Sequence, residues 1–144
     1  MLGKCLCGNV EFALSGTLPN LYQCHCSLCR KATGAAANAA LIVPGKNFQW
    51  VSGQEHISSY VKDNGYRSDF CSKCGSPLPN PLKGRAEYWI PAGLLEDTAN
   101  LEVAAHLYVG SKASWDAVAS SGLQYQESPD LENLVKALRK NQDS

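Results

Sequence analysis

Apolar residues alternate with polar ones in short runs along most of the chain. Val10, Phe12 and Leu14 alternate with Glu11 and Ala13, which predicts a half-buried strand. Further extended segments are predicted over residues 21–23, 36–43, 48–51, 57–61, 66–70, 87–90 and 104–109. Turn residues, Asp63-Asn64-Gly65 among them, separate these segments. The pattern therefore predicts a mainly β fold built from antiparallel strands.

A helical pattern is clear at the C-terminal end. Ser128 is a suitable N-cap and Pro129 suits the first helical position. Leu131, Leu134, Val135 and Leu138 then form one apolar stripe. We expect one C-terminal helix over about residues 129–140.

Composition limits the classes of partner. The 144 residues suit one domain, 1–144, with a core of its own. Thirteen basic residues balance thirteen acidic ones without a long basic block, so we expect no nucleic-acid or membrane partner and a small-molecule ligand instead. The first residues lack the pattern of a secretory signal, so we expect a cytoplasmic protein. The oligomeric state is left open.

Seven cysteines fall into closely spaced groups. Disulfides rarely persist in a reducing compartment, and an odd number of cysteines cannot all be paired. These residues are therefore interpreted as metal ligands or redox thiols.

Two of the groups resemble the halves of a structural zinc site. Cys5-x-Cys7 and Cys71-x-x-Cys74 each offer two thiols on a turn, and Gly75 suits a tight metal knuckle. A tetrahedral zinc ion needs two such pairs brought together by folding. We predict a structural zinc held by these four cysteines. A mixed pairing, in which Cys24 or Cys26 joins one of the pairs, is an alternative, although residues two or three apart in one segment most easily bind the same ion.

The remaining three cysteines form a different kind of group. Cys24, Cys26 and Cys29 fall within six residues and leave one position of a tetrahedral ion unfilled, which is the feature of a catalytic zinc. A cysteine or histidine from elsewhere could instead close the site and make it structural. A reductase using these residues as redox thiols is a further alternative. Haem attachment does not fit, because Cys29 is followed by Arg30 rather than by histidine.

Taken together, the motifs resemble a known family. They are C-x-C-G from Cys5, C-H-C-x-x-C-R-K from Cys24, F-C-x-x-C-G-S from Phe70, and His106-Leu107-Tyr108-Val109 ahead of Trp115. Over roughly residues 3–129 this ordered set is similar to the glutathione-dependent formaldehyde-activating enzymes. The resemblance implies several coiled antiparallel β-sheets with zinc knuckles, and two zinc ions, one structural and one catalytic, divided among the cysteines as above. It also implies addition of glutathione to formaldehyde, giving S-hydroxymethylglutathione, although a fold alone does not determine a substrate.

The residues around the central cysteines are candidates for substrate binding. Glutathione carries carboxylates, and Arg30 and Lys31 are the adjacent cations, although an exposed basic pair is also common without a ligand. His25 lies between two ligands and could donate a hydrogen bond or move protons, and the resemblance gives His106 a place near the site. Trp50, Trp89 and Trp115 are expected in the core or in a pocket wall.

Two functions therefore compete. One is a carbon-sulfur lyase-type enzyme acting on a thiol-aldehyde adduct. The other is a non-catalytic zinc-stabilised binding module, in which the central site only supports the fold. The identity of the fourth ligand at the central cysteines separates them.

Overall fold

The computed structural model describes residues 1–118 and 121–140. Over these residues the fold is mainly β, with eleven strands and two α-helices, one of them C-terminal. By its internal contacts the chain forms two compact units, one of Met1–Leu18 with Ile42–Ala99 and the other of Pro19–Leu41 with Asn100–Ser144. The mainly β fold and the C-terminal helix are thus confirmed, whereas the single domain over 1–144 stays a prediction.

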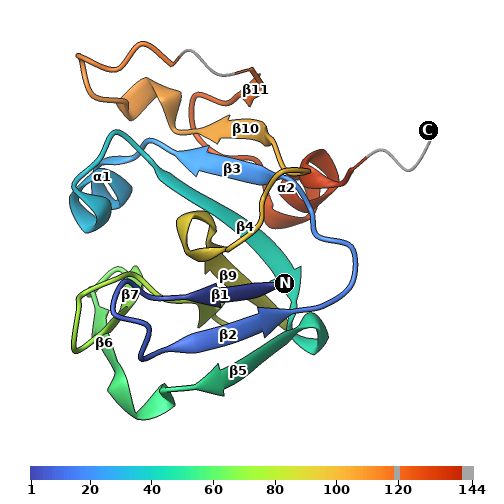
Figure 1. Cartoon of the computed structure of the whole chain (residues 1–144). Helices are drawn as coiled ribbons and strands as arrows, with labels where there is room; N and C mark the ends of the chain where they lie inside the picture. Colours follow the sequence, from blue (N-terminus) through green and yellow to red (C-terminus); the bar gives the residue numbers. More distant parts are fainter. Residues whose placement is uncertain (119–120, 141–144) are drawn as a thin grey trace. The chain divides into compact units, whose positions relative to one another are not determined.

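The first unit contains a three-stranded antiparallel sheet (Figure 1). Its order is β1, Leu2–Lys4, then β2, Glu11–Leu14, then β5, Phe48–Ser52. In β2 Phe12 and Leu14 are buried while Glu11 and Ala13 are half-buried, which is the alternation expected from the sequence. The Phe12 ring stacks on Phe48 and meets Trp50 edge-on, with centroids 5.8 and 6.3 Å apart. These rings of β2 and β5 therefore form an aromatic cluster on the sheet, in which Phe12 is fully buried.

Two antiparallel pairs complete the first unit. They are β6, Ile57–Val61, with β7, Arg67–Cys71, and β8, Asn80–Pro81, with β9, Glu87–Pro91. In the first pair Ile57 lies opposite Cys71, so the last residue of the hairpin is a cysteine. After Cys74, the prolines Pro77, Pro79 and Pro81 disfavour a helix or a central strand before residue 87, and the two-residue β8 that forms there lies at the edge of its sheet, where proline is tolerated.

The second unit is built around strand β3. Its strands are β3 (Leu21–Cys24), the first residues of β4 (Asn38–Pro44), β10 (Val103–Leu107) and β11 (Leu123–Gln124). Its helices are α1 (Ser27–Thr33) and α2 (Leu131–Leu138). β3 lies between β4 and β10. It pairs antiparallel with β4 but parallel with β10, and β10 is also parallel to β11. Parallel neighbours need a long connection, which the chain between β3 and β10 supplies.

Helix α1 is a difference from the sequence prediction, which placed no helix over the central cysteines. Its N-cap is Cys26, whose sulfur accepts from the backbone N–H of Cys29, and its C-cap is Gly34 with φ 67°. Ser, Thr, Asp and Asn are the usual N-caps, so a cysteine gave no signal. The extended segment predicted after it is confirmed as β4.

Helix α2 confirms the predicted helix with a different cap. Asp130 is the N-cap and its carboxylate accepts from the N–H of Asn133 at 3.0 Å, while the Ser128 hydroxyl donates to the Pro129 carbonyl at 2.8 Å. Leu134 and Leu138 of the predicted stripe are buried. The N–H of Asn20 donates to the carbonyl of Leu138, so the helix end is tied to the residue before β3.

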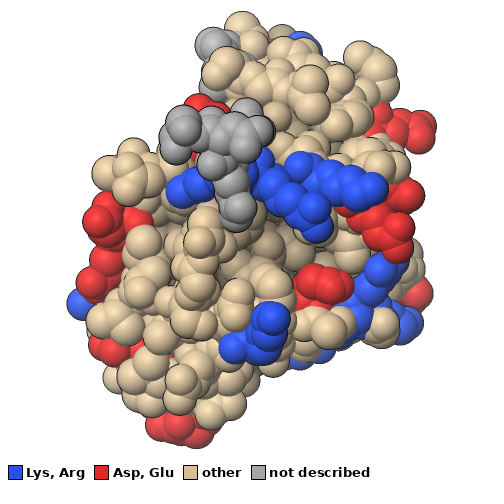
Figure 2. All heavy atoms as spheres, turned by 90° about the vertical axis from the view of Figure 1, so that its right-hand side faces the viewer, with Lys and Arg blue, Asp and Glu red and all other residues tan. Residues whose placement is uncertain are grey.

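Charged side chains of both signs are visible on the face drawn in Figure 2, within a larger area of other residues. Among the described residues, the helices are too short and too polar to cross a membrane.

Candidate functional site

Cys5, Cys7, Cys71 and Cys74 come together in the first unit, although 64 positions separate Cys7 from Cys71. Their sulfur atoms all lie within 4.8 Å of one another. The Cys7 sulfur is 3.6 Å from that of Cys5 and 3.8 Å from that of Cys71. Zinc-sulfur bonds of about 2.3 Å in a tetrahedron place the sulfurs about 3.8 Å apart. The arrangement therefore fits a metal such as zinc.

The two halves of this four-cysteine cluster have the same construction. The N–H of Gly8 donates to the carbonyl of Cys5 at 3.0 Å, and the N–H of Gly75 donates to the carbonyl of Cys71 at 2.7 Å. Both glycines have φ 80°, a left-handed conformation that a side chain disfavours. The glycine at the end of each motif is therefore required by the turn itself.

The cluster is part of the hydrophobic core of its unit. Cys5 and Cys71 are buried in one group with Val10 and Leu78, and Trp50 packs against that group. Replacing Cys5 or Cys71 by a smaller residue would therefore leave a cavity in this core.

Hydrogen bonds favour the ionised form of the more exposed thiols in this cluster. The backbone N–H and side-chain amide of Asn9 lower the pKa of Cys7, and the Asn9 amide nitrogen is 3.1 Å from its sulfur. Hydrogen bonding to Ser76 lowers the pKa of Cys74 to about 5. Burial raises the pKa of Cys5. The charged sulfurs are thus provided with donors, as metal-bound thiolates usually are.

Cys24, Cys26 and Cys29 form a second cluster, in the second unit. Cys24 ends β3, Cys26 caps α1 and Cys29 lies in its first turn, which brings the three sulfurs within 4.8 Å of one another. Cys24 and Cys29 are buried and Cys26 is half-buried. Among the described residues, no histidine, aspartate or glutamate joins the group as a fourth ligand.

Crowding makes this three-cysteine cluster suitable for a cation. Hydrogen bonding to Cys29 and burial raise the pKa of Cys24, and burial also raises the pKa of Cys26. Three thiolates so close together repel one another, and a bound dication removes both the repulsion and the protons. The cluster could therefore hold a metal such as zinc.

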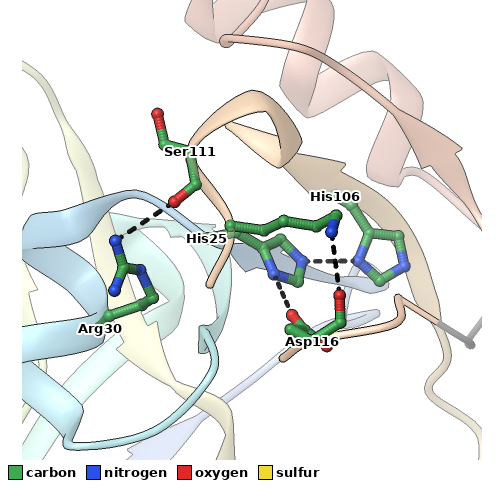
Figure 3. Close-up of polar contacts among 6 residues, drawn as sticks. His25, Arg30, His106, Ser111 and Asp116 are labelled. Carbon is green, nitrogen blue, oxygen red and sulfur yellow. Dashed lines mark hydrogen bonds and ion pairs between the residues drawn. The ribbon is translucent and has the colours of Figure 1, made fainter. Parts of the chain in front are cut away.

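The two predicted histidines contact each other (Figure 3), and His25 lies between Cys24 and Cys26 in the chain. The His25 Nε2 atom is 3.0 Å from Nδ1 of His106, and its Nδ1 atom is 3.2 Å from Oδ2 of Asp116. Nε2 of His106 is 3.3 Å from the carbonyl oxygen of Ser121. His25 is 2% exposed and His106 0%, so both rings lie away from solvent. Their predicted roles in substrate binding are not tested by these contacts.

This His25–His106–Asp116 network has more acceptors than neutral rings can serve. The Ser121 carbonyl and the Asp116 carboxylate both accept, so three contacts require three N–H protons, whereas two neutral imidazoles carry two. Burial and the neighbouring His106 lower the pKa of His25, and the Asp116 carboxylate acts in the opposite direction. Asp116 is therefore the residue that most favours the protonated form of His25.

Arg30 and Lys31 have different environments. An Nη2 of Arg30 donates to the carbonyl of Ser111 at 3.3 Å, which ties α1 to the 3-10 turn Val109–Ser111 (Figure 3). The Nε of Arg30 is buried and has no partner among the described residues. Lys31 is exposed. That these cations bind a substrate stays a prediction, and Arg30 has a structural contact besides.

Sequence reasoning missed Asp116 and misjudged its neighbour. The contact from Asp116 to His25 spans 91 positions, and a single carboxylate in a loop carries no local signal for it. Trp115, expected in the core or in a pocket wall, is 72% exposed and is no part of the core. Trp50 does pack on the core of its unit.

Comparison with known proteins agrees with these motifs. The family model described as "Glutathione-dependent formaldehyde-activating enzyme" matches residues 1–111. A protein of Halomonas elongata, provisionally named a glutathione-dependent formaldehyde-activating enzyme, is 29% identical over 126 residues, covering 82% of this chain and 80% of that protein. The crystal structure of a Rhodobacter sphaeroides protein, a structural genomics target, matches with a TM-score of 0.57 and 25% identity, over 69% of this chain and 92% of its own. With the family model matching most of its length, the chain belongs to the glutathione-dependent formaldehyde-activating enzyme family.

Proposed function

We propose that this protein is a zinc-dependent carbon-sulfur lyase-type enzyme that joins glutathione to formaldehyde and forms S-hydroxymethylglutathione. The proposal assigns a structural zinc to the four-cysteine cluster and a catalytic zinc to the three-cysteine cluster. It places the protein in the cytoplasm, where glutathione is abundant and thiols stay reduced. The family and the name of the Halomonas elongata relative support the choice of substrates.

The observation that carries the proposal is the number of ligands in each cluster. Four thiols complete a tetrahedral ion, whereas three leave one position for a substrate. Zinc bound by Cys24, Cys26 and Cys29 would stabilise the substrate sulfur as a thiolate, which is the nucleophilic form.

Each of the residues near the three-cysteine cluster has a role in this proposal. Cys24, Cys26 and Cys29 define where the substrate sulfur binds, and Arg30 and Lys31 provide positive charge for the glutathione carboxylates. His25, backed by His106 and Asp116, keeps the segment between the ligands in place. In the reaction the sulfur forms a bond to the carbonyl carbon, the C=O π pair moves to oxygen, and that oxygen takes up the proton that the thiol lost.

The experiment uses the exchange between free formaldehyde and its glutathione adduct, followed by NMR exchange spectroscopy at equilibrium. Because the adduct also forms without an enzyme, the measured quantity is the increase in exchange rate per protein. Wild type loaded with zinc should accelerate exchange, and Cys26→Ala should not, while it keeps its four-cysteine metal. 2-Mercaptoethanol in place of glutathione tests whether the rest of the substrate contributes.

Two outcomes would contradict the proposal. Exchange no faster with wild type than in buffer would favour the non-catalytic binding module. Equal acceleration by zinc-free protein would favour redox or other thiol chemistry instead.

A further inference from the structure

Tyr108 has an unusual backbone conformation at the end of strand β10. Its φ is 57°, and it is the single non-glycine residue with positive φ among the described residues. A side chain in this region costs energy, and such strain is retained where the surroundings impose it, often at functional sites. Glycine would adopt this conformation without strain, so the presence of a tyrosine here suggests that its side chain has a function.

Hydrogen bonds on both sides hold Tyr108 in this conformation. Its N–H donates to the carbonyl of Glu127 at 2.8 Å, and its carbonyl accepts from the N–H of Ser111 at 3.0 Å. The preceding residue, Leu107, lies opposite Cys24 in the parallel pair and accepts at 2.9 Å from the N–H of His25. Tyr108 thus follows directly after the contacts that join β10 to the segment of the three-cysteine cluster.

The Tyr108 side chain is within electrostatic reach of the cluster. Burial, followed by the nearby Cys24 and Cys26 and, less strongly, Glu127 and Cys29, raises the pKa of the phenol. A phenol has an ordinary pKa of about 10, so it is protonated at neutral pH and can act as a donor. The ring is half-buried, and no described residue forms a hydrogen bond with its hydroxyl group. The O–H is therefore left for a ligand or for water.

We propose that Tyr108 is a catalytic residue whose phenol O–H donates a hydrogen bond to the aldehyde oxygen while the thiol sulfur bonds to the carbonyl carbon. This inference rests on the proposed function and adds a residue to it. As the S–C bond forms, the C=O π pair moves to the oxygen, and a donor placed there stabilises the growing negative charge. Tyr108 keeps its proton throughout. The proton that the thiol releases on ionisation is transferred through water to the oxygen. The thiol and the aldehyde thus combine into the hydroxymethyl thioether with no other reactant or product.

The test compares Tyr108→Phe with Tyr125→Phe in zinc-loaded full-length protein. Phenylalanine keeps the ring in Tyr108→Phe and removes only the O–H. Tyr125 is a half-buried tyrosine of the same unit, and Tyr125→Phe is the control because it also removes one phenol O–H. Readouts are metal content, thermal midpoint, the dissociation constant for glutathione by calorimetry, and the exchange rate of formaldehyde with its adduct.

We expect Tyr108→Phe to lower the exchange rate about 10- to 100-fold, as loss of one transition-state donor does. Its metal content, midpoint and glutathione affinity should remain those of wild type, and Tyr125→Phe should exchange at the wild-type rate. An unchanged rate in Tyr108→Phe, an equal fall in both variants, or a fall that follows weaker glutathione binding would each overturn the assignment. If wild type itself does not accelerate exchange, the proposed function has failed, which is a separate result.

Discussion

The two cysteine clusters use the same chemical group in different surroundings. The four-cysteine cluster has two ligands inside a hydrophobic core, on turns that 64 positions of chain separate. The three-cysteine cluster comes from one short segment, at the junction of β3 and α1, with Cys26 half-buried. A metal in the first joins distant parts of a unit, whereas a metal in the second joins residues that are already neighbours. From ligand number and chain separation we therefore expect the four-cysteine cluster to support the fold and the three-cysteine cluster to be open to substrate.

The residues around the two clusters also differ in polarity. Around the four cysteines the contacts are apolar, with Val10, Leu78 and Trp50 in the core. Beside the three cysteines lie a buried histidine pair, Asp116 and Tyr108. Polar groups buried at a cost are more common where chemistry or recognition needs them. The following predictions test this contrast, from the largest expected effect to the smallest.

Cys71→Ser should have the largest effect on stability. Cys71 is fully buried, so the change removes a metal ligand and leaves a hydroxyl in the core. We expect the free energy of unfolding to fall by about 4 kcal/mol or more, with loss of the metal from that cluster. Chemical denaturation and metal analysis would measure both. An unchanged denaturation midpoint would show that the four-cysteine cluster is not structural.

Cys26→Ala should separate metal loss from unfolding. The residue caps α1 and is half-buried, so we expect the free energy of unfolding to fall by about 1 kcal/mol, the typical cost of a lost cap. Metal content should drop by one ion of two, and calorimetry should detect no glutathione binding. If this variant unfolds as readily as Cys71→Ser, the contrast between the clusters disappears and the binding module gains support.

Arg30→Ala tests recognition of the thiol beyond the metal. If Arg30 binds a glutathione carboxylate, its removal should raise the dissociation constant for glutathione several-fold to about a hundredfold, and added salt should also weaken binding. 2-Mercaptoethanol has no carboxylate, so its affinity should stay the same. Equal losses for both thiols would mean that Arg30 acts through its contact with the Ser111 carbonyl.

Asp116→Asn should have the smallest effect of the four on metal content and substrate binding, because it removes neither a cysteine of the two clusters nor a predicted substrate contact. The change keeps the shape but removes the carboxylate that accepts from the buried His25. We expect the free energy of unfolding to fall by about 1–2 kcal/mol, with both metals retained. Asp63→Asn, at an exposed loop position, is the matched control and should leave the denaturation curve unchanged. A loss of metal from the four-cysteine cluster in Asp116→Asn would show that the two clusters are not independent.

The sequence by itself determined the local features of this protein. The alternation around Phe12, the stripe of α2 and the cysteine spacings all act within a few residues, so the residues alone indicate strands, a helix and two groups of thiols. The turns of the four-cysteine cluster are also local, because Gly8 and Gly75 each adopt the positive φ that the turn requires. The prediction was wrong about the cap of α2, which is Asp130 rather than Ser128, because both residues are good caps and local propensity does not choose between them.

Only the tertiary structure decided which distant groups meet. The parallel pairing of β3 with β10 brings His25 to His106 across 81 positions and to Asp116 across 91, and it places Tyr108 next to the same segment. No periodicity encodes such contacts, because they depend on strand order and not on spacing. Likewise the sequence predicted Trp115 in the core or in a pocket wall because its side chain is large and apolar, yet the folded chain exposes it. Local spacing therefore indicated the two groups of cysteines, while the long-range pairing of strands selected the residues that surround them.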